Sequence, residues 1–255
     1  MNEFTDTAER ENESESRELS YLERPEEHLD DRQRRWLAPP GPAGRAARWL
    51  LYGANWCSMK LLFRPRVLGR EHLPESGPFI VAPNHSSSLD PFVLSVALGS
   101  GRISQTVWAG RRGAHLENPI RRRVNRLAHA IPINRNASAL AVGAAALDRG
   151  RILAWFPEGH RSDTGELQEF KRGVGVLMDR FQVPAVPTFI DGAYEAMPRD
   201  ARLPRRLRKV TIAFGAPVRP DFVADVPDRD QRIDRLVAAL REEVIALRES
   251  LGNAD

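Results

Sequence analysis

The chain has 255 residues, of which 42% are hydrophobic and 28% are charged. This balance is typical of a folded globular protein and excludes a collagen, a coiled coil or a wholly disordered chain. The single cysteine, Cys57, excludes an intramolecular disulfide and indicates a reducing compartment. We expect no secretory signal, because the N-terminus is acidic, and no membrane span, because no stretch reaches about 18 apolar residues.

The net charge of +4 is divided unevenly along the sequence. Residues 1–35 carry a net charge of −6, so the remainder carries +10. Among the 38 basic residues only Lys60, Lys171 and Lys209 are lysines. Because the arginine guanidinium forms forked contacts with phosphate and carboxylate groups, this excess predicts an anionic partner: a nucleic acid, a phosphorylated metabolite or an anionic membrane.

The N-terminal segment, residues 1–42, is rich in Glu, Arg, Ser and Asp and ends in a proline-rich linker. Few large apolar residues occur in it, so we predict a disordered acidic tail. A short helix somewhere within residues 15–37 is compatible with its scattered leucines, although Pro25 interrupts any regular pattern.

Residues 43–65 differ from this tail because large apolar side chains recur at spacings of three and four. A helix would place these side chains on one stripe, flanked by basic residues: Trp49, Tyr52, Trp56, Met59 and Phe63. One interpretation is an amphipathic helix at a membrane surface, and the other is a helix packed on the domain core. A helix can also do both with different faces.

From residue 66 onward, short apolar runs alternate with helical patterns, which is typical of an α/β domain. We predict a mixed, largely parallel sheet of about seven strands flanked by helices. The predicted strands are Val67–Leu68, Phe79–Ala82, Thr106–Ala109, Ala130–Ile133, Ile152–Phe156, Ala185–Ile190 and Val210–Phe214. The predicted helices are Pro91–Leu98, Pro119–Leu127, Ser138–Arg149, Gly173–Arg180 and Gln231–Glu249.

A candidate site follows the strand that ends at Ala82. His85 lies in the next loop, and Asp90 precedes Pro91 at the start of a helix. Open α/β sheets bind ligands at the carboxyl ends of their strands. Asp90 is therefore placed to cap the helix and also to accept the Nδ1 proton of His85, which would leave Nε2 free as a general base. The spacing alone also fits a capping aspartate beside an ordinary loop histidine.

Polar residues also follow the predicted strand Ile152–Phe156. If this strand and the one before His85 are parallel neighbours, Glu158, Gly159 and Arg161 meet His85 at one edge of the sheet. Gly159 would allow close backbone approach, Arg161 would hold a phosphate, and Glu158 would bind a substrate hydroxyl or hold Arg161. The alternative is a turn with a surface salt bridge.

Two further segments contain a candidate phosphate contact and a predicted strand. Arg135 follows the predicted strand Ala130–Ile133 and is a third candidate for a phosphate contact, although this segment by itself favours an ordinary surface arginine. The run Val183–Pro187 contains two prolines, which predicts a strand at the edge of the sheet.

In chain order, four segments resemble the glycerolipid acyltransferase family. They are Asn84-His85-x4-Asp90, Ile133-x-Arg135, Phe156-Pro157-Glu158-Gly159-x-Arg161-Ser162 and Val183-Pro184-x-Val186-Pro187. The resemblance covers about residues 66–215 and implies an acyltransferase domain over residues 66–250. The sequence departs from the family pattern at Ala130, Pro132 and His160, which concern the acceptor more than the reaction.

The resemblance implies an O-acyltransferase in which His85 deprotonates the acceptor hydroxyl and Asp90 orients the imidazole. The alkoxide would attack the thioester of acyl-CoA or of acyl carrier protein, and neither a cofactor nor a metal is expected. The residues that the resemblance assigns to the acceptor are Arg135, Glu158, Gly159 and Arg161. The implied acceptor is a lysophospholipid, above all 1-acylglycerol 3-phosphate, at the cytoplasmic face of a membrane that the protein would join as a peripheral or monotopic enzyme.

Alternatives stay open at this stage. Another lyso-lipid, a glycolipid or an aminolipid could be the acceptor, and a non-catalytic lipid-binding module would share the fold. Nucleic-acid binding is another alternative, because basic residues cluster between residues 111 and 126 and in the run Pro204–Lys209. No aromatic stacking motif accompanies them, so we expect no nucleic-acid partner and assign these charges to anionic lipid head groups.

Overall fold

The computed structural model describes residues 18–111, 118–133, 137–201 and 203–252. Its centre is a seven-stranded sheet in the order β1-β7-β6-β2-β5-β3-β4. The strands are β1 (Arg66–Leu68), β2 (Phe79–Pro83), β3 (Thr106–Arg111), β4 (Ala130–Ile133), β5 (Ile152–Ala154), β6 (Ala185–Asp191) and β7 (Thr211–Phe214). Only β6 and β7 pair in the antiparallel sense among these described strands. The predicted mixed, largely parallel sheet is confirmed.

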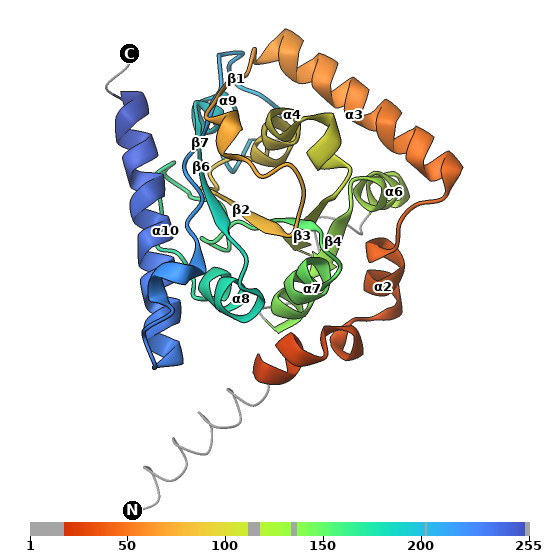
Figure 1. The fold of residues 1–255 in the computed structure, drawn as a ribbon. Helices are drawn as coiled ribbons and strands as arrows, with labels where there is room; N and C mark the ends of the chain where they lie inside the picture. The colour runs from red at the N-terminus through yellow and green to blue at the C-terminus, as the bar shows by residue number, and fades with distance from the viewer. Residues whose placement is uncertain (1–17, 112–117, 134–136, 202, 253–255) are drawn as a thin grey trace, which may run out of the picture.

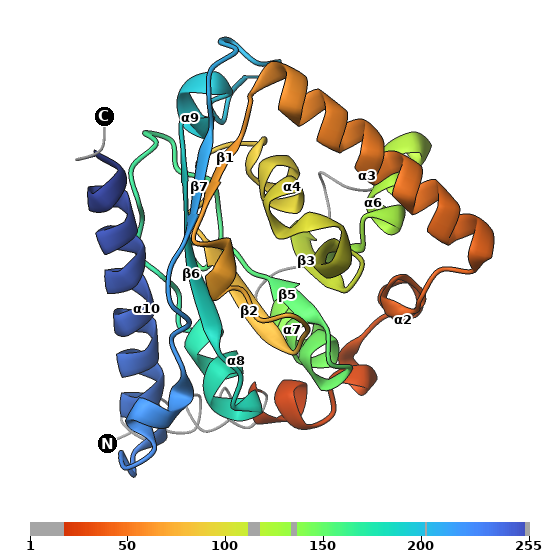
Figure 2. The same cartoon turned by 45° about the horizontal axis from the view of Figure 1, so that its top comes forward.

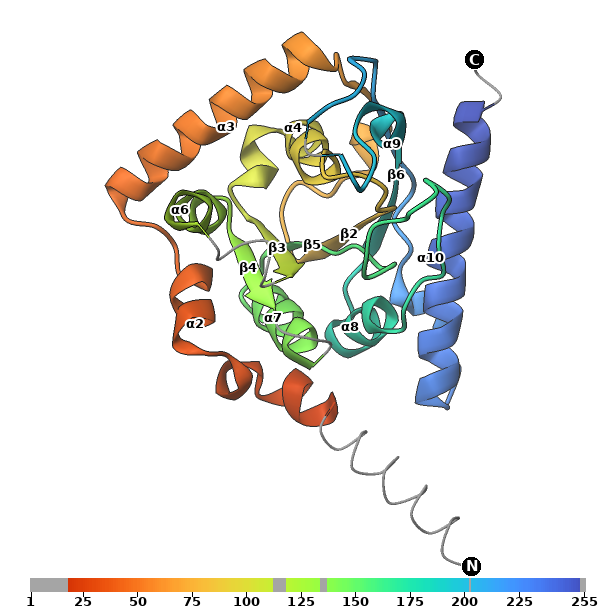
Figure 3. The same cartoon turned by 180° about the vertical axis from the view of Figure 1, so that it is seen from behind.

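Helices cover both faces of the sheet (Figures 1 and 3). One face carries α7 (Ala137–Asp148), α8 (Gly173–Phe181) and α10 (Arg229–Gly252). The other carries α4 (Asp90–Ile103), and α3 (Pro42–Leu62) lies across the outer side of α4 and α6 (Pro119–Leu127). The shorter elements are η1 (Pro25–His28), α2 (Asp31–Leu37), η2 (Arg70–His72), α9 (Ala193–Ala196) and η3 (Pro220–Val223), and residues 18–23 are also helical.

Side-chain alternation along the strands divides the interior into two cores. In β2, Ile80 and Ala82 join the cluster beneath α7, α8 and α10, whereas Phe79 and Val81 join the cluster beneath α4. A strand covered on both faces is apolar at every position, which is why β2 appears in the sequence as a continuous apolar run. The burial of these residues fixes the register of the strand and therefore the place where its carboxyl end opens into the site.

The strand that contains Pro187 is not at the edge of the sheet, so this prediction is wrong. β6 lies between β2 and β7. The antiparallel ladder to β7 begins at Thr188, and Pro187 contributes its carbonyl oxygen, which accepts a hydrogen bond of 2.9 Å from the Gly215 nitrogen. An interior strand therefore tolerates this proline because the ladder on the β7 side ends before a donor is needed there.

The prediction of disorder over residues 1–42 is wrong for the part that the structure describes, which begins at residue 18. η1 packs along α7 and α2 packs along β4 (Figure 3). Figure 2 shows this segment beside α7, and its few apolar side chains are buried in the core beneath α7. A capping box between Asp30 and Gln33 starts α2, and the Gln33 side chain donates a buried hydrogen bond of 2.8 Å to the Pro132 carbonyl. The residues of this segment that belong to the core cluster are Leu22, Leu29, Trp36 and Leu37.

The aromatic stripe of α3 is divided between two environments. Met59 and Phe63 are buried in the core beneath α4, whereas Trp49 remains 48% exposed. On its outer side the helix also exposes Leu50 (77%) and Leu61 (78%). None of the helices in the described part of the chain combines the length and the hydropathy that a bilayer span requires. The core interpretation is therefore confirmed for the end of α3 that carries Met59 and Phe63, and the membrane-surface interpretation stays a prediction for its exposed outer side.

Candidate active site

Strand pairing brings the two predicted loops together. β2 and β5 are parallel neighbours, as expected, so the chain after Pro83 and the chain after Ala154 leave the sheet at the same edge. β5 ends two residues earlier than predicted, and Phe156 belongs to the loop. The Ser162 nitrogen donates a hydrogen bond of 2.8 Å to the His85 carbonyl oxygen, which ties the second loop to the first.

The His85 ring is held by Asp90. Its Nδ1 lies 2.9 Å from Asp90 Oδ2, and the same oxygen accepts hydrogen bonds of 2.8 Å from the backbone nitrogens of Ser86 and Ser87. Asp90 is fully buried, so its carboxylate is fixed by these three donors. A carboxylate at Nδ1 selects the tautomer that carries its proton there and leaves a lone pair on Nε2.

Asp90 does not cap the helix, so that part of the sequence interpretation is wrong. It is the first residue of α4, and the N-cap position is Leu89. Its carboxylate points back to the preceding loop because the imidazole and two backbone N–H groups supply donors there. The positive end of the helix dipole still lies next to this buried negative charge and stabilises it.

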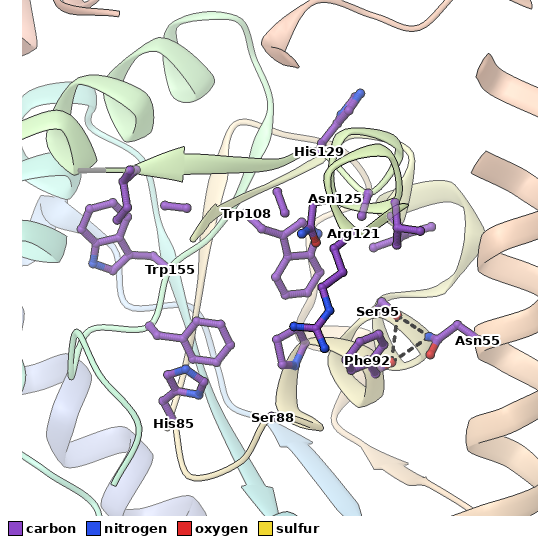
Figure 4. Close-up of a pocket in the computed structure, with 18 of the residues that line it drawn as sticks. Asn55, His85, Ser88, Phe92, Ser95, Trp108, Arg121, Asn125, His129 and Trp155 are labelled. Carbon is purple, nitrogen blue, oxygen red and sulfur yellow. Dashed lines mark hydrogen bonds between the residues drawn. The ribbon is translucent and has the colours of Figure 1, made fainter. Parts of the chain in front are cut away.

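The free edge of the His85 ring faces a cleft. The ring stacks on Phe156, with a centroid distance of 4.0 Å, and 18% of the side chain is exposed. Among the described residues, Nε2 has no hydrogen-bond partner. Figure 4 shows His85 and Trp155 at one side of the cleft, with Trp108 between Trp155 and Arg121. The ring is thus oriented at one end and accessible at the other, as proton transfer requires.

Glu158 is buried and connects the two loops. Its Oε1 accepts a hydrogen bond of 2.6 Å from the His85 backbone nitrogen, and its Oε2 accepts from the Gln168 nitrogen at 3.1 Å and from Gln168 Nε2 at 3.0 Å. Burial raises the pKa of this carboxyl, while the three hydrogen bonds favour its charged form. Both oxygens of Glu158 are therefore occupied by the protein itself.

Arg161 lines the cleft beside His85, as predicted, but its guanidinium is partly engaged. Nη1 donates a short hydrogen bond to the Ser88 hydroxyl and another of 3.3 Å to the Arg199 carbonyl oxygen. Arg199 in turn donates to Asp163 Oδ1 at 2.8 Å. Of the sequence candidates, the structure brings His85, Asp90, Glu158, Gly159 and Arg161 together, whereas Arg135 lies outside the described residues.

The cleft has a volume of about 1860 Å³, which is larger than a typical pocket for one small ligand. It extends from His85 beneath α3, between α4 and α6. Apolar residues of these helices line it, including Tyr52, Phe92 and Val124, and Arg121 reaches into it (Figure 4). On the α3 side, Asn55 Nδ2 donates to Ser95 Oγ at 2.8 Å.

The cleft ends at the opposite edge of the sheet in a basic group. Arg48 of α3 donates to the Ile103 carbonyl at 2.8 Å and lies 3.1 Å from His129 Nδ1. Burial, together with the charges of Arg48 and Arg151, lowers the pKa of His129 to about 3. His129 is therefore neutral at physiological pH and can accept the hydrogen bond from Arg48.

Sequence reasoning missed several residues of this site. Phe156, whose ring stacks on His85, was assigned to a strand, and Gln168 and Arg199 belong to no sequence motif. Lys171 lines the cleft beside Gly159, and its rarity as one of three lysines is a signal that could have found it.

Comparison with known proteins agrees with this geometry. The family model described as Acyltransferase matches residues 64–191. Human 1-acyl-sn-glycerol-3-phosphate acyltransferase alpha is 33% identical over 134 residues, which cover 49% of this chain and 44% of that relative. The Bacillus subtilis 1-acyl-sn-glycerol-3-phosphate acyltransferase is 24% identical over 73% of this chain and 89% of its own length. The chain thus spans about half the length of the human relative.

The fold is also that of a solved structure. The crystal structure of the 1-acyl-sn-glycerophosphate (LPA) acyltransferase from Thermotoga maritima superposes with a TM-score of 0.60 at 21% identity, over 80% of this chain and 82% of that one. The matched family segment contains both loops that meet at the cleft, from His85 to Arg161. On the strength of that match, which covers half of the sequence, this chain belongs to the acyltransferase family.

Proposed function

We propose that this protein transfers a fatty acyl chain from acyl-CoA or acyl carrier protein to the free hydroxyl of a lysophospholipid, with 1-acylglycerol 3-phosphate as the acceptor and phosphatidic acid as the product. The observation that carries the proposal is the His85–Asp90 pair, with Nδ1 held at 2.9 Å and Nε2 facing the cleft. The names of the human and Bacillus subtilis relatives support the choice of acceptor.

In the proposed reaction His85 Nε2 removes the proton of the acceptor hydroxyl as the oxygen attacks the thioester carbonyl carbon. Asp90 stabilises the imidazolium that forms, because its buried carboxylate lies at Nδ1. The tetrahedral intermediate then breaks its carbon–sulfur bond, and the imidazolium returns the proton to the sulfur. The products are an ester and a free thiol. A thioester is activated enough for oriented base catalysis, so the proposal includes neither a cofactor nor a metal.

The proposal places the protein on a bilayer, at the cytoplasmic face where the thioester donors occur. The exposed apolar side of α3 supports this placement, since Leu50 and Leu61 are more than three-quarters exposed. Lys60 lies 5.9 Å from the ring centroid of Trp56 on the same helix, an aromatic and basic pairing that suits the interface. A lipid acceptor could enter the cleft from this side because α3 also lines it.

The test is thiol release from acyl-CoA or acyl carrier protein in the presence of 1-acylglycerol 3-phosphate. We expect the wild type to release thiol and the His85→Ala variant to lose at least a hundredfold in rate. His28→Ala is the matched control, because His28 bonds to Ser20 away from the cleft. Equally slow thiol release by the wild type and by His85→Ala would contradict the catalytic proposal and would favour a non-catalytic lipid-binding module.

A further inference from the structure

A phosphorylated acceptor needs a cation that is not already neutralised by the protein. The distance available is short, because in 1-acylglycerol 3-phosphate the free hydroxyl and the phosphate sit on neighbouring carbons. The cation must therefore lie on the same side of the cleft as the base that takes the hydroxyl proton. Arg161 keeps its positive charge, because its Nη1 partners, the Ser88 hydroxyl and the Arg199 carbonyl, are neutral, but these two hydrogen bonds hold its guanidinium against the protein.

Lys171 is placed differently. Its backbone nitrogen donates a hydrogen bond of 2.9 Å to the Pro157 carbonyl, which anchors it beside the loop that follows β5. Its side chain crosses Gly159: a Cβ atom at Gly159 would lie 2.9 Å from the lysine Nζ and 3.0 Å from its Cε. Gly159 also has φ +77°, which favours glycine. The glycine therefore leaves room for the lysine to reach the cleft.

Two consecutive residues link this lysine to the base. Glu158 accepts the hydrogen bond from the His85 nitrogen, and the next residue, Gly159, contacts Lys171. His85 and Lys171 both line the cleft. The residue that positions the His85 backbone and the residue that the Lys171 side chain crosses are therefore consecutive in one loop.

The ammonium of Lys171 is exposed and makes no hydrogen bond or ion pair among the described residues. Three carboxylates of its loop are used elsewhere. Glu158 accepts three N–H donors, Asp163 pairs with Arg199 at 2.8 Å, and Glu166 pairs with Arg248 at 2.6 Å. Glu169 is exposed and does not line the cleft. The positive charge of Lys171 is thus available to an anion that enters beside His85.

We propose that Lys171 binds the phosphate monoester of the acceptor and makes the site selective for phosphorylated over unphosphorylated acceptors. This inference rests on the proposed function and deepens it. A compact ammonium at the end of a flexible chain can follow the phosphate as the hydroxyl moves onto His85. Arg161 then has a structural role in the site, because it donates hydrogen bonds to the Ser88 hydroxyl and to the Arg199 carbonyl oxygen.

The kinetic test compares Lys171→Met and Lys171→Arg with Lys209→Met, whose lysine does not line the cleft. We expect Lys171→Met to raise KM for 1-acylglycerol 3-phosphate about tenfold, with kcat and the KM for the thioester donor within twofold, and Lys171→Arg to restore most of the loss. Turnover of unphosphorylated 1-acylglycerol should be unchanged. An unchanged KM for the phosphorylated acceptor, or a raised KM for the donor instead, would overturn the assignment.

A binding measurement separates this inference from the catalytic proposal. Equilibrium binding of 1-acylglycerol 3-phosphate is measured in the His85→Ala background, with and without Lys171→Met. About tenfold weaker binding in the double variant supports the role of Lys171 even if no thiol release is found, and equal binding contradicts it even if His85 proves essential. Melting temperatures of both variants control for folding.

Discussion

Glu158 Oε1 accepts a hydrogen bond of 2.6 Å from the backbone nitrogen of His85. The contact ties two loops that are 73 residues apart, and the carbonyl of His85 is bound in turn by the Ser162 nitrogen. Both backbone polar groups of His85 are therefore satisfied by the segment after β5. The geometry gives Glu158 a positioning role, although the resemblance of the sequence to its family implied contact with the acceptor.

The Glu158→Gln variant distinguishes these roles. A glutamine has one acceptor oxygen, so either the His85 nitrogen or the Gln168 donors would meet an N–H group instead. We expect kcat to fall about tenfold or more with the acceptor KM within twofold. Glu166→Gln, on the exposed side of the same loop, is the matched control. A raised acceptor KM with an intact kcat would assign Glu158 to the substrate.

The Asp90→Asn variant tests the charge at Nδ1. The amide oxygen can still accept from the backbone nitrogens of Ser86 and Ser87, so the loop should keep its shape. Without the negative charge the imidazolium is less stable, and we expect kcat to fall on the order of a thousandfold. Steady-state thiol release measures this change, and near-UV circular dichroism checks the fold. A loss below threefold with an intact fold would remove Asp90 from the mechanism.

His129 predicts a pH dependence of stability that is separate from catalysis. Its pKa is about 3 in the folded protein and about 6.5 in the unfolded chain, so the unfolded state binds more protons between these values. Stability should therefore fall as pH falls through this window, by about 2 kcal/mol between pH 6.5 and pH 5 from this group alone.

Urea unfolding at pH 7 and pH 5 measures this contribution in the wild type and in His129→Asn. Asparagine accepts the positive φ of 55° at this position and can accept a hydrogen bond from Arg48. The variant should lose less stability on acidification than the wild type, by about the same 2 kcal/mol. Parallel losses in both proteins would show that His129 does not carry the effect.

The outer side of α3 predicts the strength of membrane binding. Replacing Leu50 and Leu61 by serine removes two exposed leucines without touching the buried Met59 or Phe63. We expect partition onto vesicles that contain anionic phospholipid to weaken at least tenfold. Phe222→Ser, at an exposed aromatic on η3, is the control and should leave flotation unchanged. Unaltered binding of the double variant would show that the exposed leucines of α3 do not bind the membrane.

The N-terminal segment predicts a loss of stability when its anchor is removed. Trp36 is 4% exposed and belongs to the core beneath α7. Trp36→Ala should lower the free energy of unfolding by about 3 kcal/mol or more, since a large buried ring leaves a cavity. Arg35→Ala, at the neighbouring exposed position, should change it by less than about 0.5 kcal/mol. Chemical denaturation of both variants measures the difference, and equal values would contradict the burial of Trp36.

The sheet was predictable because its strands are apolar on both faces, and strands such as β2 and β4 appear in the sequence as continuous runs bounded by polar loops. The packing of the segment around Trp36 could not be predicted, because exposed charged residues dominate its composition. The four apolar side chains that dock it are too few to form a pattern, and their partners on α7 are about a hundred residues away.

The site also contains residues that could be predicted from the sequence and residues that could not. His85 and Asp90 became candidates through their place after a strand, and the resemblance of four ordered segments to the family, rather than their spacing alone, favoured a catalytic role. For Glu158 the residue type was informative but the direction of its side chain was not, because that depends on donors supplied by Gln168 and by the backbone of another loop. Lys171 was missed because nothing in the chain order says that its side chain crosses Gly159.

The pairing of β1 with β7 has a consequence for the order of events during synthesis. β1 directly follows α3, and its partner in the sheet is β7, almost 150 residues later in the chain. The Val210 nitrogen also donates a hydrogen bond to the Phe63 carbonyl at the end of α3. On the ribosome, the helix that roofs the cleft cannot acquire this anchor until residue 214 has emerged. The residues around His85 are therefore made long before the helix that covers the cleft is fixed in place.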